Sequence, residues 1–499
     1  MPMAANEMDE FKEKCAVFGI IGPKTDKRTG LEAARLTFYG LWALQHRGQE
    51  SSGIASSDGA NLHRHAAPGL VATVYREEDL EQLPGHIAIG HNRYSTSGGT
   101  DDCYNQPFVD HKRKIAFAHN GNLPDWTKLE EFLTDRGVKL NKLNDSSMMS
   151  AAIGCYMDDG LDLVDAIKRA YPLFTGVFSA VIMDTKRLIA FRDACGVRPL
   201  SIGKLDGGYA IASETCAFDT VGAEFVRDVE PGEMVVISED SMEMESHQVV
   251  KGQTKLDIFE LVYFARPDSL LLGKRVDMVR QDFGRVMARE FPIDADVIVP
   301  VPDSGIPAAL GYSQASGIPF EMALIKNRYI HRTFIRPTAQ LRERDLKMKL
   351  NPVIELMKDK RVVLVDDSIV RGTTMRHLVS MVFEAGAKEV HLLISCPPVR
   401  YPDFYGINTP KQSELLAAYM TEKEMGEYVG ATSLSFLSFD GMMQATGLPA
   451  DNFTVSCFTG EYPISIGIRS KEIVKLKPGQ VLPRSSHTPP QLATARSAS

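Results

Sequence analysis

The feature that most restricts the fold is a short apolar run that is followed directly by two acidic residues. Residues 361–365, Arg-Val-Val-Leu-Val, are mostly β-branched and apolar, and Asp366 and Asp367 follow them directly. This pattern predicts a buried strand that ends in two carboxylates. Similar apolar runs at 297–300 and 390–395, separated by stretches with helical spacing, predict βαβ units on a mostly parallel sheet.

The residues after this strand have the composition of a phosphate site. In open α/β sheets, ligands bind at the carboxyl ends of the strands. Backbone N–H groups at a helix N-terminus, together with Ser and Thr hydroxyls, form a cradle for phosphate. A pair of aspartates suits ribose hydroxyls and a magnesium ion. The candidate ligand contacts are Asp366, Asp367, Ser368, Arg371, Gly372, Thr373 and Thr374.

The N-terminal half follows a different pattern. From Cys15 to about residue 240, short apolar runs such as 16–21 and 115–118 alternate with Gly, Asn and Asp turns, and these predict strands. Segments such as 146–157 have the apolar spacing of helices. We therefore expect a layered α+β domain with much antiparallel sheet, followed by an α/β domain.

Composition narrows the class of protein further. The 499 residues have a net charge of −8, which argues against a surface that binds nucleic acid. A run of 18 apolar residues is lacking, so we expect no membrane span. The seven scattered cysteines indicate reduced thiols in a cytoplasmic protein. Residues 1–14 are predicted to be a leader or a frayed terminus, and the Pro- and Ser-rich residues 478–499 a disordered tail.

Four segments in the N-terminal half carry a family resemblance. Cys15 begins Cys-Ala-Val-Phe-Gly-Ile, and Gln-His-Arg-Gly-Gln (45–49), Asn-Arg-Tyr-Ser-Thr (92–96) and His-Asn-Gly-Asn (119–122) follow in that order. They resemble the glutaminase domain of N-terminal-nucleophile amidotransferases. The second and third segments are most similar to the amidophosphoribosyltransferase (glutamine phosphoribosylpyrophosphate amidotransferase) family.

This resemblance implies that residues 1–14 are removed and that Cys15 becomes the first residue. A free α-amino group has a pKa of roughly 7.7–8.0, so it can accept the proton of the thiol near neutral pH. With such a base available, we expect His46, His91 and His119 to be structural.

The resemblance also assigns the binding of glutamine. The Asn120 side chain and the Gly121 N–H would donate to the oxyanion of the tetrahedral intermediate. Arg93 would bind the α-carboxylate of glutamine, and Asp145 its α-ammonium group. The chain has Asp145-Ser146-Ser147 where the family usually has Asp, Ser or Thr, and Glu.

Three C-terminal segments resemble type I phosphoribosyltransferases. The Asp366–Thr374 string is similar to their phosphoribosyl-pyrophosphate fingerprint. Asp303 and Ser304 lie in a segment that resembles the pyrophosphate loop, where Gly305 replaces a serine that many relatives link to the metal. Asp366 and Asp367 then remain as the candidate metal ligands.

The third segment is a basic run that resembles the mobile lid of the family. Residues 326–349 contain eight Lys or Arg and two Asp or Glu, a local charge of +6 on a negative protein. Such a lid could close over the pyrophosphate and exclude water. Lys326, Arg328 and Arg332 are the candidate pyrophosphate contacts.

One departure from the family concerns an iron–sulfur cluster that many members bind through four cysteines. The corresponding positions here are Asp257, Asp403, Thr454 and Cys457, so only one thiolate is present. One thiolate cannot hold a cubane cluster that usually needs four. We expect magnesium as cofactor, no iron–sulfur cluster, and Cys457 as a packed thiol.

Together the resemblances imply an enzyme that makes 5-phosphoribosylamine, glutamate and pyrophosphate from glutamine and 5-phosphoribosyl-1-pyrophosphate, the first committed step of purine synthesis. They place a glutamine amidotransferase domain at 15–250 and a phosphoribosyltransferase domain at 251–470, with residues 263–269 forming either an ammonia channel or plain interdomain packing. They also imply a homo-oligomer, purine nucleotide inhibitors, and neither nucleic acid nor membrane as a partner.

Two alternatives remain at this point. One is an N-terminal-nucleophile amidotransferase with another acceptor, which would not need the 366–374 fingerprint. The other is a non-catalytic sensor of phosphoribosyl pyrophosphate, which would not need Cys15, Arg93, Asn120 and Asp145.

Overall fold

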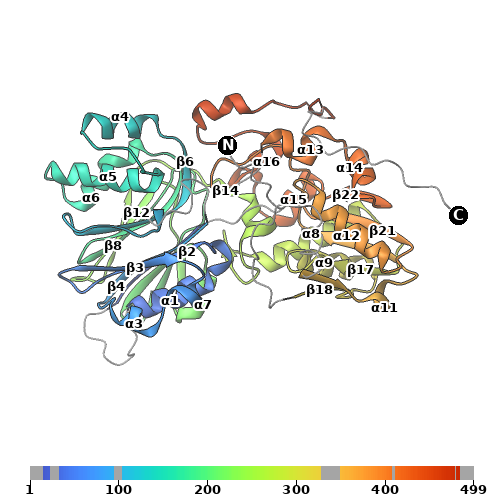
Figure 1. The fold of residues 1–499 in the computed structure, drawn as a ribbon, viewed down its shortest axis with the longest axis horizontal. Coiled ribbons are helices and arrows are strands. Elements are labelled where there is room, and N and C mark those ends of the chain that lie inside the picture. The colour runs from blue at the N-terminus through green and yellow to red at the C-terminus, as the bar shows by residue number, and fades with distance from the viewer. Residues whose placement is uncertain are drawn as a thin grey trace.

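The computed structural model describes residues 15–22, 33–94, 104–327, 349–406, 411–477 and 479–483. Within these ranges the chain forms two halves that lie side by side, one built by the N-terminal elements and the other by the elements after about residue 270 (Figure 1). No helix in the described ranges is long and apolar enough to cross a membrane.

The N-terminal half contains two antiparallel sheets. In sheet order the first has β11 (Glu224–Asp228), β9 (Ser201–Leu205), β10 (Gly208–Ala212), β1 (Ala16–Ile21), β4 (Ile87–Arg93), β2 (Ser51–Ser57) and β3 (Leu62–Pro68). The second has β13 (Met244–Gln248), β12 (Glu233–Ser238), β8 (Arg187–Arg192), β7 (Thr175–Met183), β6 (Ile115–Asp125) and β5 (Phe108–Asp110).

The two sheets stack with helices outside, because each strand alternates its side chains between two apolar layers. On β1, Val17 and Ile21 enter the core between the sheets, whereas Phe18 and Ile20 enter the core beneath the helices. The outer helices are α1 (Ala33–Ala43) and α7 (Cys216–Val221) on the first sheet, and α4 (Thr127–Asp135), α5 (Asp145–Asp158) and α6 (Leu163–Ala170) on the second. This sandwich of two sheets confirms the expected layered α+β domain with much antiparallel sheet.

The C-terminal half is built on a parallel sheet in the order β17-β20-β21-β22. These strands are β17 (Val297–Pro300), β20 (Arg361–Asp366), β21 (Glu389–Ile394) and β22 (Ser433–Phe436). The main surrounding helices are α8 (Val276–Glu290), α9 (Ile306–Ser316), α12 (Thr373–Glu384), α14 (Glu422–Val429) and α15 (Phe439–Thr446). The expected parallel sheet is confirmed.

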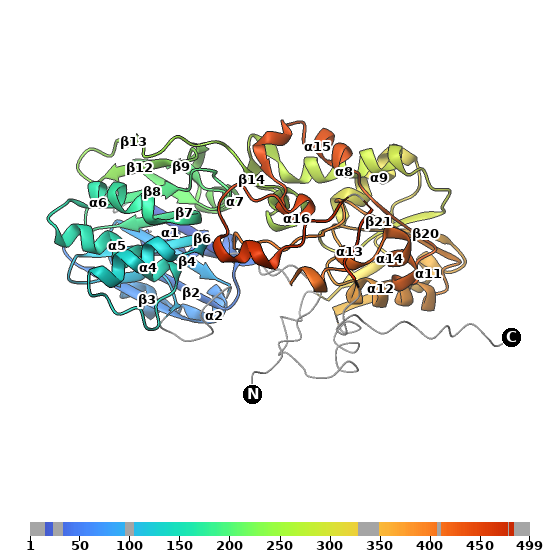
Figure 2. The same ribbon diagram turned by 90° about the horizontal axis from the view of Figure 1, so that it is seen from above.

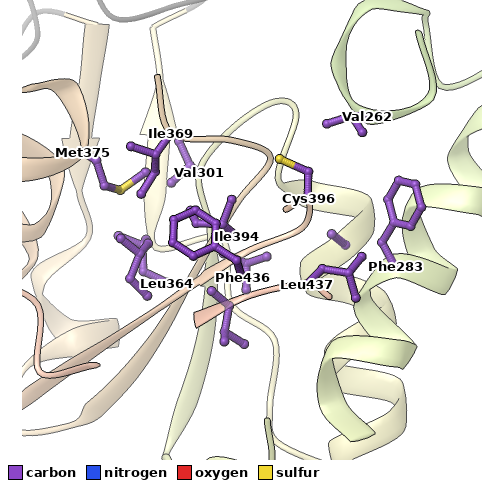
Figure 3. Packing of buried hydrophobic residues seen from close by; sticks show 14 of the residues in the cluster. Val262, Phe283, Val301, Leu364, Ile369, Met375, Ile394, Cys396, Phe436 and Leu437 are labelled. Atoms are coloured by element: carbon purple, nitrogen blue, oxygen red, sulfur yellow. The ribbon is translucent and has the colours of Figure 1, made fainter. Parts of the chain in front are cut away.

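Apolar side chains cover both faces of this parallel sheet. Leu364 and Ile394 come from neighbouring strands and lie at its centre, with Ile369 and Met375 from the following loop and helix on one side (Figure 3). Cys396 lies on the other side, towards Phe283 of α8. Burial on both faces explains why these strands are nearly continuous apolar runs in the sequence.

Late segments of the chain connect the two halves. The short strands β14 (Leu256–Asp257) and β23 (Phe453–Thr454) pair in parallel at the junction. The 3-10 helix η7 (Gly467–Glu472) lies against β6 of the N-terminal half (Figure 2). The C-terminal end of the described chain therefore packs on the sandwich as well as on its own half.

Candidate active sites

The thiol of Cys15 lies where β1 and β4 come together. Ala16 pairs with Asn92, which places Cys15 beside Arg93 and Tyr94, and the Cys15 Sγ is 3.6 Å from the Tyr94 carbonyl oxygen. Burial raises the pKa of this thiol to about 11; the positive charge of Arg93 offsets part of that rise, and the negative charge of Asp145 adds to it. Both predicted glutamine-binding residues therefore lie within electrostatic reach of the predicted nucleophile.

Asn120 and Gly121 lie on β6, the strand of the second sheet that faces β4. The Nε2 of His91 is 3.1 Å from the carbonyl oxygen of His119, so the two strands lie against each other at this point. The Asn120 side chain is 1% exposed, and its Nδ2 has no hydrogen-bond partner among the described residues. A buried donor without an acceptor costs free energy, so this amide suits an acceptor that arrives with a substrate.

The backbone at Gly121 admits only glycine. Its φ is +145°, and a Cβ there would lie 2.0 Å from the carbonyl oxygen of Val177 on the neighbouring strand β7. Close packing of β6 on β7 thus fixes the peptide that carries the predicted oxyanion donor.

Asp145 is the first residue of α5 and is 5% exposed. Asn144 caps this helix, with its side chain accepting the Ser147 N–H at 2.9 Å. Asp145 accepts the N–H of Ser146 at 2.8 Å and that of Leu123 at 3.3 Å. Leu123 follows Gly121 by two residues on β6, the strand that carries both predicted oxyanion donors. These hydrogen bonds therefore hold the carboxylate predicted to bind the ammonium group close to that strand.

Each of the three histidines has a partner on at least one ring nitrogen, while the Nδ1 atoms of His46 and His91 are buried without a partner among the described residues. The pKa of His91 is lowered to about 3 by burial and by the nearby charges of Arg93 and His119, so the ring is neutral at pH 7. Burial also lowers the pKa of His119, whose Nδ1 is 2.9 Å from Ser146 Oγ. His46 Nε2 is 2.8 Å from Glu214. These contacts suit the structural roles predicted for the histidines.

The second predicted site lies at the carboxyl edge of the parallel sheet. Asp366 ends β20, and its Oδ1 accepts the N–H of Asp367 at 2.9 Å. Asp367 in turn accepts the Ser368 hydroxyl at 2.5 Å. Gly372, with a φ of +80°, then precedes α12, whose first two residues are Thr373 and Thr374. The predicted strand, acid pair, loop and helix are thus present in that order.

The loop after β17 lies on the same edge of the sheet. The N–H of Val301 donates to the carbonyl oxygen of Val365 at 2.8 Å, and a Cβ at Gly305 would lie 2.4 Å from that oxygen. A serine at position 305 therefore does not fit this packing. The structure brings Asp303 and Ser304 to the same sheet edge as Asp366 and Asp367.

The donor set at this edge suits magnesium bound partly by substrate. The described residues contain no group of three or more His, Cys, Asp or Glu side chains that could hold a metal. Mg²⁺ is commonly held by one or two carboxylates together with water and substrate phosphates. Asp366 and Asp367 fit that mode.

The predicted basic contacts are only partly described. Lys326 Nζ is 2.8 Å from Asp303 in an exposed ion pair. Arg371 is 2.8 Å from Glu414. Arg328 and Arg332 lie outside the described residues.

Sequence reasoning missed a buried ion-pair network at the junction of the halves. Arg47 donates to the Cys15 carbonyl oxygen at 3.4 Å, and it pairs with Glu214 at 2.5 Å and Glu260 at 2.9 Å. All three charged side chains are almost fully buried. The motif around Arg47, Gln-His-Arg-Gly-Gln, is polar, so no local pattern marks its burial. Charged side chains are rarely buried unless they are paired, and the partners of Arg47 lie far away in the sequence.

The positions that correspond to cluster ligands hold part of the same network. Asp257 pairs in register with Thr454, and Arg198 lies 2.8 Å from Asp257 and 3.7 Å from Asp403. Burial raises the pKa of Asp257 to about 6, against the opposing effect of Arg198. Cys457 is buried in the C-terminal core, as expected for a packed thiol. The lack of an iron–sulfur cluster stays a prediction.

The two halves have the make-up of a glutamine amidotransferase joined to a phosphoribosyltransferase, and comparisons with known proteins agree. A family model described as a glutamine amidotransferase domain matches residues 91–220. A second one, described as a phosphoribosyl transferase domain, matches residues 284–403.

Full-length relatives extend this match. The amidophosphoribosyltransferase of Synechocystis sp. is 45% identical over 472 residues, covering 93% of this chain and 94% of the relative. That of Bacillus subtilis is 42% identical, covering 92% and 96%. The structure of the Bacillus subtilis glutamine phosphoribosylpyrophosphate amidotransferase complexed with ADP and GMP matches with a TM-score of 0.84 and 42% identity, covering 91% of this chain and 98% of that chain.

The chain belongs to the amidophosphoribosyltransferase family. It is an enzyme of purine biosynthesis that makes 5-phosphoribosylamine from glutamine and 5-phosphoribosyl-1-pyrophosphate.

Proposed function

We propose that the two half-reactions take place at the two sites described above, with Cys15 releasing ammonia and the edge formed by Asp303 and the 366–374 loop holding the phosphoribosyl acceptor. The observation that carries the first assignment is the buried, unpartnered Nδ2 of Asn120 on the strand beside the thiol. A donor held dry and without an acceptor matches the requirement of an oxyanion site.

The glutamine half-reaction begins with the α-amino group that removal of residues 1–14 would create on Cys15. This amine takes the thiol proton, and the thiolate attacks the side-chain amide carbon of glutamine. Asn120 Nδ2 and the Gly121 N–H stabilise the oxyanion. The intermediate then collapses to a thioester, and ammonia leaves with the proton that the amine returns. Water hydrolyses the thioester to glutamate.

Glutamine itself is held by its α-carboxylate and α-ammonium groups. Arg93 provides a planar set of donors for the carboxylate, and Asp145 provides the negative charge for the ammonium. The effect of both charges on the pKa of Cys15 supports this assignment, because it requires them to lie near the thiol. The reacting amide would thereby be oriented towards Cys15.

The phosphoribosyl acceptor is held at the edge of the parallel sheet. Asp366 and Asp367 bind the ribose hydroxyls, while Ser368, Thr373, Thr374 and the N–H groups of Arg371 and Gly372 bind the 5-phosphate. Asp303, Ser304, Lys326, Arg328 and Arg332 are the proposed pyrophosphate contacts. A magnesium ion held by Asp366 and Asp367 would neutralise charge on the pyrophosphate oxygens. Ammonia forms a bond to C1 as the bond from C1 to the pyrophosphate oxygen breaks.

Several finer points belong to the same proposal. Purine nucleotides are proposed as inhibitors, supported by the nucleotides ADP and GMP in the Bacillus subtilis structure. A homo-oligomer, a cytoplasmic location and domain boundaries at 15–250 and 251–470 stay predictions.

Glutamine labelled with nitrogen-15 in its amide tests the proposal. The enzyme, supplied with this glutamine, phosphoribosyl pyrophosphate and magnesium, should form labelled phosphoribosylamine, glutamate and pyrophosphate in equal amounts. Glutamine hydrolysis measured with and without phosphoribosyl pyrophosphate gives the paired control. Binding of phosphoribosyl pyrophosphate without any turnover would favour the sensor, and glutamate formation without phosphoribosylamine would favour another acceptor.

A further inference from the structure

A segment of the C-terminal half lies directly on the strand that carries the proposed oxyanion donors. The Asn122 Nδ2 donates to the carbonyl oxygen of Phe404 at 2.8 Å. A Cβ at Gly406 would lie 3.2 Å from the carbonyl carbon of Gly121 and 3.4 Å from its Cα. The backbone on the carboxyl side of Gly121 is therefore in van der Waals reach of residues 403–406.

This 403–406 segment is firmly held. Arg198, which is fully buried, donates to the carbonyl oxygen of Tyr405 from Nε at 3.0 Å and from Nη2 at 2.8 Å. The Tyr405 N–H donates to Asp403 at 2.8 Å, and its hydroxyl donates to the carbonyl oxygen of Ile464 at 2.6 Å. Hydrogen bonds at both ends of Tyr405 fix the position of the segment.

Apolar contacts join the same segment to the sandwich. Phe404 and Tyr405 form one buried cluster with Val177, Val197 and Ile466. Val177 is also the residue whose carbonyl oxygen excludes a side chain at Gly121, and it pairs with Asn122 across β6 and β7. Strand β6, which carries the proposed oxyanion donors, thus contacts its own sheet on one side and the 403–406 segment on another.

We propose that the 403–406 segment is a positioning element through which the phosphoribosyltransferase half sets the geometry of the oxyanion donors in the glutamine half. The inference rests on the roles proposed above for Asn120 and Gly121. Asn122 and Gly406 are positioning residues, because they act on the donor strand and not on the substrate.

Gly406→Ala tests the proposal by placing a methyl group against β6, the strand that carries the proposed oxyanion donors. The new Cβ would lie 3.2 Å from the carbonyl carbon of Gly121, so the neighbouring backbone must give by a few tenths of an ångström. Displacement of a catalytic group by about 1 Å can cost on the order of 100-fold in rate. For a shift of a few tenths of an ångström we expect kcat for glutamine hydrolysis to fall by a smaller factor, about 3- to 10-fold. KM for glutamine should stay unchanged, because oxyanion donors act in the transition state. Synthesis from added ammonia should also stay unchanged.

Gly430→Ala is the matched control. Gly430 also has a positive φ, +77°, and ends helix α14 in the same half, but a Cβ there meets nothing within 4 Å. It places alanine at a positive φ without the contact, although the backbone at Gly406, with a φ of +110°, is the more strained of the two. We expect its glutamine and ammonia activities to match those of the parent enzyme.

Asn122→Ala provides a second variant that adds no bulk. It removes the hydrogen bond to Phe404, and we expect a fall of about fivefold in kcat for glutamine hydrolysis, the amount that one hydrogen bond commonly contributes. If Gly406→Ala fails to fold and loses both activities, Asn122→Ala decides the question.

The outcomes separate this inference from the function on which it rests. Equal glutamine kcat in Gly406→Ala, Asn122→Ala and the parent enzyme would overturn the positioning role, and so would equal losses in Gly406→Ala and Gly430→Ala. A parent enzyme that makes no phosphoribosylamine from glutamine would instead overturn the proposed function.

Discussion

The two halves of the molecule differ in how deeply their candidate site residues are buried. In the sandwich, Arg93, Asn120 and Asp145 are each at most 5% exposed, and they come from strands and from a helix start that are packed on both sides. At the edge of the parallel sheet Asp367 is buried as well, but Asp303 and Lys326 are exposed side chains, 59% and 45%. To stabilise the charge of a small intermediate, a site must hold its donors fixed and away from water. A large anion can bind at an open sheet edge, because the anion itself then covers that edge and displaces water.

The difference has a consequence for mutations. In the sandwich half, a substitution should remove one half-reaction and leave the other. At the sheet edge, a substitution should weaken synthesis from every source of nitrogen, because glutamine-derived and added ammonia meet the same acceptor.

Replacing Cys15, the proposed nucleophile, should give the largest effect. We expect Cys15→Ala to lower glutamine-dependent synthesis by at least about 10⁴-fold, as removal of a catalytic nucleophile does in other enzymes. Synthesis from added ammonia should remain at the parent level. Parallel assays with glutamine and with ammonium chloride check both. Loss of both activities in a folded variant would show that the two sites are not separable.

The reactivity of the Cys15 thiol should depend on whether residues 1–14 are attached. In the full chain, burial raises the pKa of this thiol to about 11, so its thiolate fraction is small near neutrality and rises with pH. Compared with an ordinary cysteine, that fraction at pH 7 is lower by about two orders of magnitude. We expect slow alkylation of Cys15 that increases up to about pH 11.

Removal of residues 1–14 should reverse this behaviour. The exposed amine then serves as a base, and alkylation should level off near pH 8. Peptide mass spectrometry after a pulse of iodoacetamide measures the rate at Cys15, with buried Cys457 as an internal control that should stay unmodified. Equal rates on the two forms would contradict a role for the amine.

Removing the unpartnered amide donor should have the next largest effect. Loss of one oxyanion donor typically costs 10²–10³ in kcat, so we expect a fall of about that size in glutamine hydrolysis for Asn120→Ala. KM for glutamine should change little. A KM that rises while kcat holds would instead identify Asn120 as a substrate-binding residue.

Neutralising one acid at the sheet edge should have the smallest effect of the four, but on both nitrogen sources. We expect Asp366→Asn to lower glutamine- and ammonia-dependent synthesis alike by about 10- to 100-fold, since a hydrogen bond to a charged group contributes about 1.5–3 kcal/mol. The magnesium concentration for half-maximal rate should rise.

Asp296→Asn is the control for that variant. Asp296 lies at the opposite end of the same pair of strands and only pairs with Arg361 on the surface. Its activities should match those of the parent enzyme. An Asp366→Asn variant that loses glutamine activity alone would break the contrast between the halves.

The sequence predicted the elements of the fold well where one physical signal dominated. The predicted strands at 16–21 and 297–300 coincide with β1 and β17. The predicted helix at 146–157 falls within α5. These segments are buried along their whole length or on one complete face. The spacing of their apolar residues is therefore enough to predict the type of element.

The sequence predicted less where the cause is a contact between distant segments. The predicted strand at 115–118 is only the first part of β6, which continues through Asn120 and Gly121 to Asp125. Polar residues there are buried because β7 and the C-terminal half cover them. No local pattern in the sequence indicates this burial. The same reason hid the pairing of Arg47 with Glu214 and Glu260, which lie far apart in sequence.

If nitrogen is released at a cysteine whose own amine is free, glutamine use should depend on whether residues 1–14 have been removed. Preparations with different fractions of processed chain are quantified by intact mass, and each is assayed with glutamine and with ammonia. We predict that glutamine-dependent synthesis rises in proportion to the fraction that lacks residues 1–14, while ammonia-dependent synthesis is the same in all. A chain that keeps residues 1–14 and makes phosphoribosylamine from glutamine at the full rate would contradict the account.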